Sequence, residues 1–196
     1  MTRAEKMALQ EKLERVFAEC IDEMDAIDIP YGNIVKVEVN FRAERRWGQC
    51  RKRGTEYSIN INADLLGNEA SEKGLRETII HEILRTCPNC MCHTGEWKRL
   101  AELVSDCYPY DITRTASAED VGMSAEYIER KEEERIERKM NAKYRFHCAG
   151  CGVKITRNRE SRFTEHWEWY RCSKCGGNIV CDSHVRLGLN GKLATA

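Results

Sequence analysis

A histidine and a glutamate stand side by side at His81 and Glu82, inside the mostly apolar run 79–84. Two histidines four residues apart on a helix can bind one zinc ion, while a glutamate directly after the first histidine activates the metal-bound water. Here the residue four positions after His81 is Arg85. A guanidinium stays protonated and has no lone pair to donate to zinc. The sequence therefore predicts a zinc-hydrolase type of site that lacks one ligand.

A third candidate ligand is His93, eight residues after Arg85. A catalytic zinc site normally uses three protein ligands and a water, so two imidazoles alone would hold the ion weakly. In one interpretation, Cys90, Cys92 or Glu96 completes a site with His81 and His93. Cys87 is a poor substitute, because six residues rotate it away from the helical face of His81.

Two other interpretations give Arg85 a larger role. In the second, the Arg85 cation lies near the expected metal position and pairs with Glu82, which leaves a folded, metal-free pseudoenzyme. In the third, Arg85 is a substitution that inactivates an otherwise active enzyme. The fixed positive charge favours these two interpretations over metal binding with a substitute ligand.

Four cysteines near the other end of the chain have the spacing of a structural zinc site. They form two C-x2-C pairs separated by twenty residues: Cys148, Cys151, Cys172 and Cys175. Each pair presents two thiolates to one tetrahedral ion, so the pattern predicts a zinc ribbon with one structural Zn²⁺. His147, His166 and Cys181 are not needed as ligands, because four sulfurs complete the coordination.

Basic and aromatic residues lie between the two cysteine pairs. The candidate nucleic-acid-binding residues are Lys154, Arg157, Arg159, Arg162, Trp167 and Trp169. Cations contact phosphates and aromatic rings stack on unpaired bases, so this strip could bind single-stranded nucleic acid. The alternative is that Trp167, Trp169 and Tyr170 form the small core of the ribbon.

Together these features resemble the SprT-like family, which is related to Spartan. The shared features are a Trp47-Gly48-Gln49-Cys50 strand, the helix with His81 and Glu82, His93 followed by Gly95 and Trp97, and the terminal ribbon. The resemblance covers roughly residues 5–181 and departs from the family at Arg85. It implies a zincin-like metallopeptidase fold, Glu82 as catalytic residue, His81 and His93 as ligands of a catalytic Zn²⁺, and DNA and DNA-bound proteins as partners. A non-catalytic nucleic-acid or protein adaptor that uses the ribbon is the alternative function.

Composition sets further limits. The chain has 196 residues, of which 41% are hydrophobic and 33% charged. It has no apolar stretch long enough to span a bilayer and no leader-like N-terminus, so we expect a cytoplasmic protein without a membrane partner. Eleven cysteines in that compartment predict thiols and metal ligands, not disulfides. Residues 143–196 contain ten Lys or Arg against four Asp or Glu, which permits contact with nucleic acid without requiring it. The oligomeric state stays open.

The pattern predicts an α+β fold with helices around a small antiparallel sheet. We expect helices over 3–26, from Ser71 to near Pro88, over 95–107 and over 126–140, and strands over 34–41, 47–50 and 57–61 with a turn at 51–55. The corresponding organisation is a SprT-like domain at 1–118, a charged helical connector at 119–143, the zinc ribbon at 144–181 and a tail at 182–196.

Overall fold

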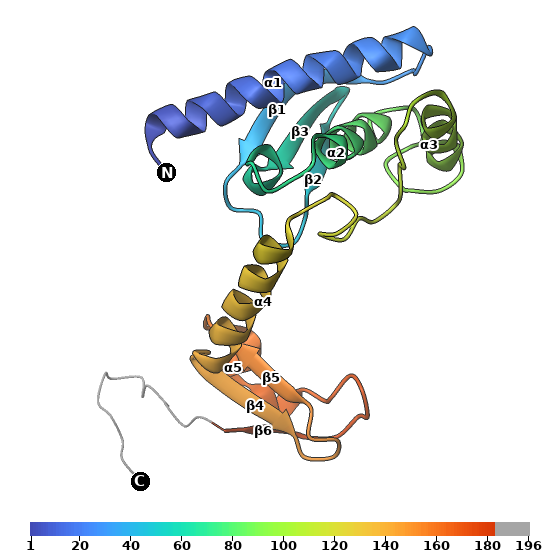
Figure 1. Ribbon diagram of the computed structural model, residues 1–196. Helices are drawn as coiled ribbons and strands as arrows, with labels where there is room; N and C mark the ends of the chain where they lie inside the picture. The colour runs from blue at the N-terminus through green and yellow to red at the C-terminus, as the bar shows by residue number, and fades with distance from the viewer. Residues whose placement is uncertain (183–196) are drawn as a thin grey trace. The chain divides into compact units, whose positions relative to one another are not determined.

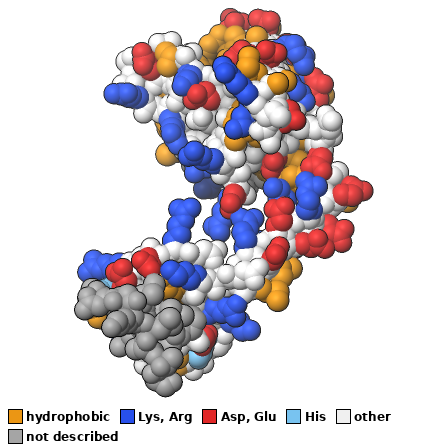
Figure 2. Space-filling view, turned by 90° about the vertical axis from the view of Figure 1, so that its left-hand side faces the viewer, with side chains coloured by type: hydrophobic (Ala, Val, Ile, Leu, Met, Phe, Trp, Pro, Cys, Tyr) orange, Lys and Arg blue, Asp and Glu red, His pale blue; other side chains and the backbone are white. Residues whose placement is uncertain are grey.

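The computed structural model describes residues 1–182. Of the expected tail at 182–196, residues 183–196 lie outside the described residues. The described residues form two compact units, which divide between Ile128 and Glu129. Both contain helices and a small sheet (Figure 1), so the α+β prediction is confirmed. Lys and Arg side chains and Asp and Glu side chains are both exposed on the face shown in Figure 2.

The helices of the first unit begin and end close to the predicted positions. They are α1 (Arg3–Ala26), α2 (Glu72–Leu84), α3 (Glu96–Cys107) and the start of α4 (Ala125–Met140). Thr2 caps α1 in a capping box with Glu5, and Ser71 caps α2 through the Gly74 amide. No helix in residues 1–182 is both long and apolar enough to cross a bilayer.

The sheet of the first unit differs in one respect from the prediction. Its order is β1 (Asn33–Asn40), β3 (Glu56–Asn62), β2 (Gly48–Arg53). β2 and β3 form the expected antiparallel hairpin, but β1 pairs with β3 in parallel. The reason is that β3 carries the fully buried Ile59 and Ile61 and takes the central place, so the chain crosses from β1 to the far edge before returning.

The hairpin turn is also shorter than predicted. Residues 51–53 stay in β2, where Arg51 pairs with Ser58 and Arg53 with Glu56. Only Gly54 and Thr55 form the turn, and Gly54 has a positive φ of 63°. A two-residue hairpin needs this left-handed backbone, which glycine adopts without a steric penalty.

Packing places α2 where it can present the candidate site. α1 packs on β1 and α2, and α2 packs on β2 and β3 (Figure 1). Leu75, Ile79 and Ile83 of α2 are buried in the core, so the face carrying His81 points elsewhere.

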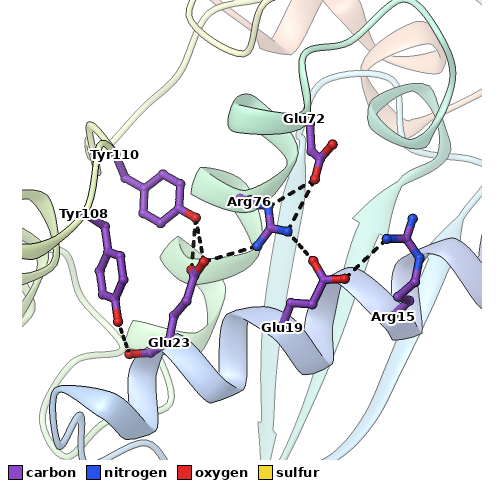
Figure 3. Close-up of polar contacts among 7 residues, drawn as sticks. All are labelled: Arg15, Glu19, Glu23, Glu72, Arg76, Tyr108 and Tyr110. Carbon is purple, nitrogen blue, oxygen red and sulfur yellow. Dashed lines mark hydrogen bonds and ion pairs between the residues drawn. The ribbon is translucent and has the colours of Figure 1, made fainter.

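A polar network at the junction of α1 and α2 fixes their register. Arg76 of α2 pairs with Glu19 and Glu23 of α1 and with Glu72 of its own helix (Figure 3). Tyr110 donates to the Glu23 carboxylate at 2.9 Å, so the irregular segment after α3 is tied to the same cluster. Arg76 lies five residues before His81 on α2, and the network therefore anchors the helix that carries the site.

The second unit is a three-stranded antiparallel sheet ordered β5 (Lys154–Arg157), β4 (Tyr144–Cys148), β6 (Ile179–Cys181). A short helix α5 (Arg162–Glu165) and a 3₁₀ turn η2 (Trp167–Trp169) lie between β5 and β6 in sequence. Its buried core is small and consists of Phe146, Cys148, Cys172 and Ile179. A core of this size usually needs a metal, disulfides or association with another chain to be stable.

Candidate functional sites

The four ribbon cysteines converge as their spacing predicts. All four Sγ atoms lie within 4.8 Å of one another, with Cys148 and Cys175 3.4 Å apart and Cys151 and Cys172 3.7 Å apart. Four thiolates at about 2.3 Å from one tetrahedral zinc would be ~3.8 Å apart. This is the only group of three or more potential ligands found within residues 1–182.

The backbone around the cysteines also fits a metal-binding thiolate cluster. Hydrogen bonds from the Cys151 and Gly150 amides lower the pKa of Cys148 to about 6 and so favour its thiolate, the form that zinc requires. The Gly177 amide lowers the pKa of Cys175, but hydrogen bonds to the neighbouring sulfurs outweigh it and raise that pKa to about 12. A Cβ on Gly177 would lie 2.9 Å from the Cys148 sulfur, so only glycine leaves room there. The four cysteines can therefore hold one Zn²⁺, and the zinc would crosslink the two halves of the ribbon.

The two histidines near the ribbon are used elsewhere. His147 contacts Asp182, and His166 stacks on Trp169 with ring centroids 4.1 Å apart. The two tryptophans of the predicted nucleic-acid-binding strip differ in exposure. Trp167 packs against Phe146 at the small core, whereas Trp169 is 65% exposed. Lys154, Arg157, Arg159 and Arg162 are all exposed.

In the first unit, His81 and His93 meet as expected from their positions. Their Nε2 atoms are 2.8 Å apart, and Trp97 packs edge-on against both rings. His81 Nδ1 lies 2.9 Å from the Thr113 carbonyl oxygen, which can only accept a hydrogen bond. His81 therefore carries its proton on Nδ1, and its Nε2 presents a lone pair toward His93.

His81 is neutral at physiological pH. Burial lowers the pKa of His81 to about 4, with smaller contributions from His93 and Arg85. Burial and the nearby Arg85 and Arg114 also lower the pKa of His93. With both rings neutral, His93 Nε2–H donates to His81 Nε2.

Arg85 follows α2 as its C-terminal cap and turns back toward Glu82. Its Nη1 lies 3.2 Å from Glu82 Oε2, and the two side chains are 20% and 5% exposed. Its Nη2 makes a long contact of 3.5 Å to the Met91 carbonyl oxygen, and its buried Nε has no hydrogen-bond partner. The ion pair thus joins Glu82 to Arg85, the residue four positions after His81.

Gly48 makes the position of Glu82 possible. A Cβ on Gly48 would lie 2.7 Å from both Cγ and Oε1 of Glu82, so the strand approaches the carboxylate only because residue 48 has no side chain. Burial raises the pKa of Glu82, while Arg85, the Cys50 amide and Arg46 lower it. Trp47 and Gly48 thus line the cleft beside Glu82.

The residues of the first unit do not fit a catalytic zinc. Within residues 1–182, no third His, Cys, Asp or Glu lies close enough to His81 and His93 to complete a three-ligand site. Cys90 is buried and contacts the Pro88 carbonyl, Cys92 is exposed, and Glu96 pairs with Arg99. The substitute-ligand interpretation therefore finds no support in the geometry, and the Arg85–Glu82 pairing of the second interpretation is present.

Three residues at this site were not singled out by the sequence. Thr113 acts through a backbone carbonyl, which has no sequence signature. Arg46 and Arg114 come from loops before β2 and after α3, and both line a cleft of about 540 Å³ with His81 and Glu82. Arg46 directly precedes the Trp47–Cys50 run and could have been recognised from that position. No neighbouring motif indicates a role for Arg114.

The sequence matches no family model and no curated protein. The functional assignment therefore depends on the residues and on their geometry.

Proposed function

We propose that residues 1–128 form a SprT-like, zincin-type peptidase domain whose catalytic zinc site is disabled by Arg85. The observation that carries this proposal is the Arg85–Glu82 ion pair beside the contacting His81 and His93 rings. Two imidazoles and a glutamate are the groups that metal-assisted hydrolysis would use, and Arg85 stands in the sequence where a third ligand would be expected. The chain then binds one zinc, in the ribbon, and is silent as a peptidase.

The resemblance to the SprT-like family suggests the target of such a domain. DNA-bound proteins are the class of polypeptide that the cleft would engage, and the ribbon would bring the domain to DNA. Without a catalytic metal, binding would not lead to cleavage.

Zinc stoichiometry tests the proposal. The purified full chain should contain one zinc, and Arg85→His should contain two, because the new imidazole joins His81 and His93. Adding His93→Ala to Arg85→His should return the content to one. Arg85→Gln is the matched control, since it removes the charge without supplying a ligand and should stay at one zinc. Two zincs in the unmodified chain, one of them lost on His93→Ala, would contradict the proposal.

A second candidate function is supported by the exposed Trp169. Its ring is stacked on His166, and the Arg162 guanidinium lies 5.9 Å from its centroid. A solvent-facing tryptophan next to cations is suited to stack on an unpaired base. We propose that the ribbon binds single-stranded nucleic acid through this surface, which would also serve an adaptor without peptidase activity.

Binding to a fluorescent oligothymidine tests this second function. Affinity should fall steeply with salt and drop several-fold in Trp169→Ala, with the zinc content unchanged. Val180→Ala, which truncates another exposed side chain of the same unit, is the control and should bind normally. Equal loss in both variants, or binding that is insensitive to salt, would exclude the Trp169 surface.

A further inference from the structure

The cleft that contains His81 and Arg85 is richer in unpaired cations than in unpaired carboxylates. Arg45, Arg46 and Arg114 line it, and within residues 1–182 none of them has an ion-pair partner among the Asp and Glu side chains. All three are exposed side chains from the loops that border the cleft. Unpaired cations around a cavity attract anions, and partial exclusion of water strengthens that attraction.

Most carboxylates that line the same cleft are already engaged. Glu82 pairs with Arg85, and Glu77 lies 3.6 Å from Lys73 and accepts from the Asp111 amide at 2.6 Å. Asp120 accepts from the Ser117 amide at 2.8 Å. Asp111 is the fourth, and it is exposed. The acidic groups thus offset the arginines only in part.

Arg85 and His81 lie in the cleft beside His93. Arg85 can donate hydrogen bonds but cannot bind a cation. Arg85 supplies guanidinium N–H groups of which Nε is unpartnered. His93 holds its Nε2–H toward His81, because the Thr113 carbonyl fixes the proton of His81 on Nδ1. That proton is therefore already engaged, and the Arg85 guanidinium is the group among these that suits an oxygen ligand bearing negative charge.

We propose that this cleft is an oxyanion-binding site, in which Arg46, Arg85 and Arg114 recognise a phosphate or carboxylate group of the ligand. The inference rests on the proposed function, because it assigns a ligand class to the position where an intact relative would hold zinc. The replacement of one histidine by arginine then reverses the charge preference of the site. A doubly charged phosphate should bind more tightly than a carboxylate, since three arginines line one cleft.

The experiment uses the full, zinc-analysed chain and follows backbone amide NMR shifts of Gly48, Glu82 and His93 during titration at constant ionic strength. The probes are inorganic phosphate and acetate. We expect saturable shifts with phosphate at a dissociation constant on the order of 1 mM, and weaker binding of acetate. Preference for acetate would instead indicate that a carboxylate is the natural anchoring group.

Variants locate the anion. Arg46→Gln and Arg114→Gln should each weaken phosphate binding about fivefold, as expected from losing one charge-assisted contact near solvent. Arg53→Gln removes an exposed cation at the end of β2, outside the cleft lining, and should bind like the unmodified chain. Equal weakening by Arg53→Gln would show general charge attraction and overturn the site.

Zinc content separates the two proposals. If the chain holds one zinc and phosphate causes no saturable shift, the oxyanion site is wrong while the disabled peptidase stands. If the chain holds two zincs and phosphate binding disappears with the second zinc in His93→Ala, the anion is a metal ligand and both proposals are wrong.

Discussion

Breaking the Arg85–Glu82 ion pair should destabilise the first unit by leaving a buried carboxylate without its cation. Glu82 is 5% exposed, and Arg85 at 20% exposed lies at the cleft wall, where water partly screens the pair. Removing one partner of a fully buried pair costs about 3–5 kcal/mol, so for Arg85→Gln we expect a loss of about 2–4 kcal/mol in the free energy of unfolding. Glu82→Gln leaves the more exposed partner unpaired and should cost about 1–2 kcal/mol.

Urea denaturation of the full chain, followed by far-ultraviolet circular dichroism, measures these losses. The double variant Arg85→Gln with Glu82→Gln should be more stable than the sum of the single losses predicts, because no charge is left unpaired. Arg99→Gln is the matched control. It breaks another ion pair with i,i+3 spacing, to Glu96, but Arg99 is 62% exposed and water screens the pair, so the loss should be much smaller than that of Arg85→Gln.

The loss should also depend on pH in a defined direction. Burial raises the pKa of Glu82, so stability falls as pH rises from the unfolded value of a glutamate through the raised value in the folded chain. Arg85 opposes that rise, and without it the decline in stability becomes larger and extends to higher pH. Arg85→Gln should therefore be less destabilised at mildly acidic pH than at neutral pH. A loss equal to that of Arg99→Gln, or one that persists in the Glu82→Gln background, would refute the reasoning.

Three further changes test other parts of the structure. Gly48→Ala should cost about 1–3 kcal/mol in urea denaturation, because the new methyl group overlaps the Glu82 side chain. Arg76→Gln should cost about 1–3 kcal/mol, since it leaves adjacent carboxylates of α1 and α2 without their shared cation; Arg15→Gln, which removes only one exposed pair, should cost under about 1 kcal/mol. Cys172→Ser should release the ribbon zinc and expose residues 144–181 to protease, measured by metal analysis and limited proteolysis, and a protected ribbon with full zinc would contradict the assignment.

Local patterns were enough to predict most elements and the ribbon ligands. The apolar spacing of α1, the Ser71 cap of α2 and each C-x2-C pair can be recognised from a few neighbouring residues. The meeting of His81 and His93 was also foreseen, but only through the resemblance to a known family. Each of these features depends on short-range sequence or on a known arrangement.

Features that depend on tertiary distance could not be obtained in this way. The parallel pairing of β1 follows from competition among strands for the central place, and no single strand encodes it. The contact between Gly48 and Glu82 joins residues far apart in the chain. Trp167 and Trp169 are two residues apart and of the same type, yet one is packed and the other exposed. Their residue type and position in the sequence give no basis for predicting this difference.

The distribution of thiols gives the protein a built-in pair of labelling positions. Burial raises the pKa of Cys20 and Cys87 to about 12 and that of Cys50 to about 11, so these thiols resist alkylation in the folded chain. Zinc in the ribbon would protect four more. Within residues 1–182, Cys92 and Cys107 are the two exposed thiols outside the ribbon, and Cys92 directly precedes His93. A maleimide dye on Cys92 can therefore report occupancy of the cleft, with Cys107 at the end of α3 as its internal reference, without any engineered cysteine.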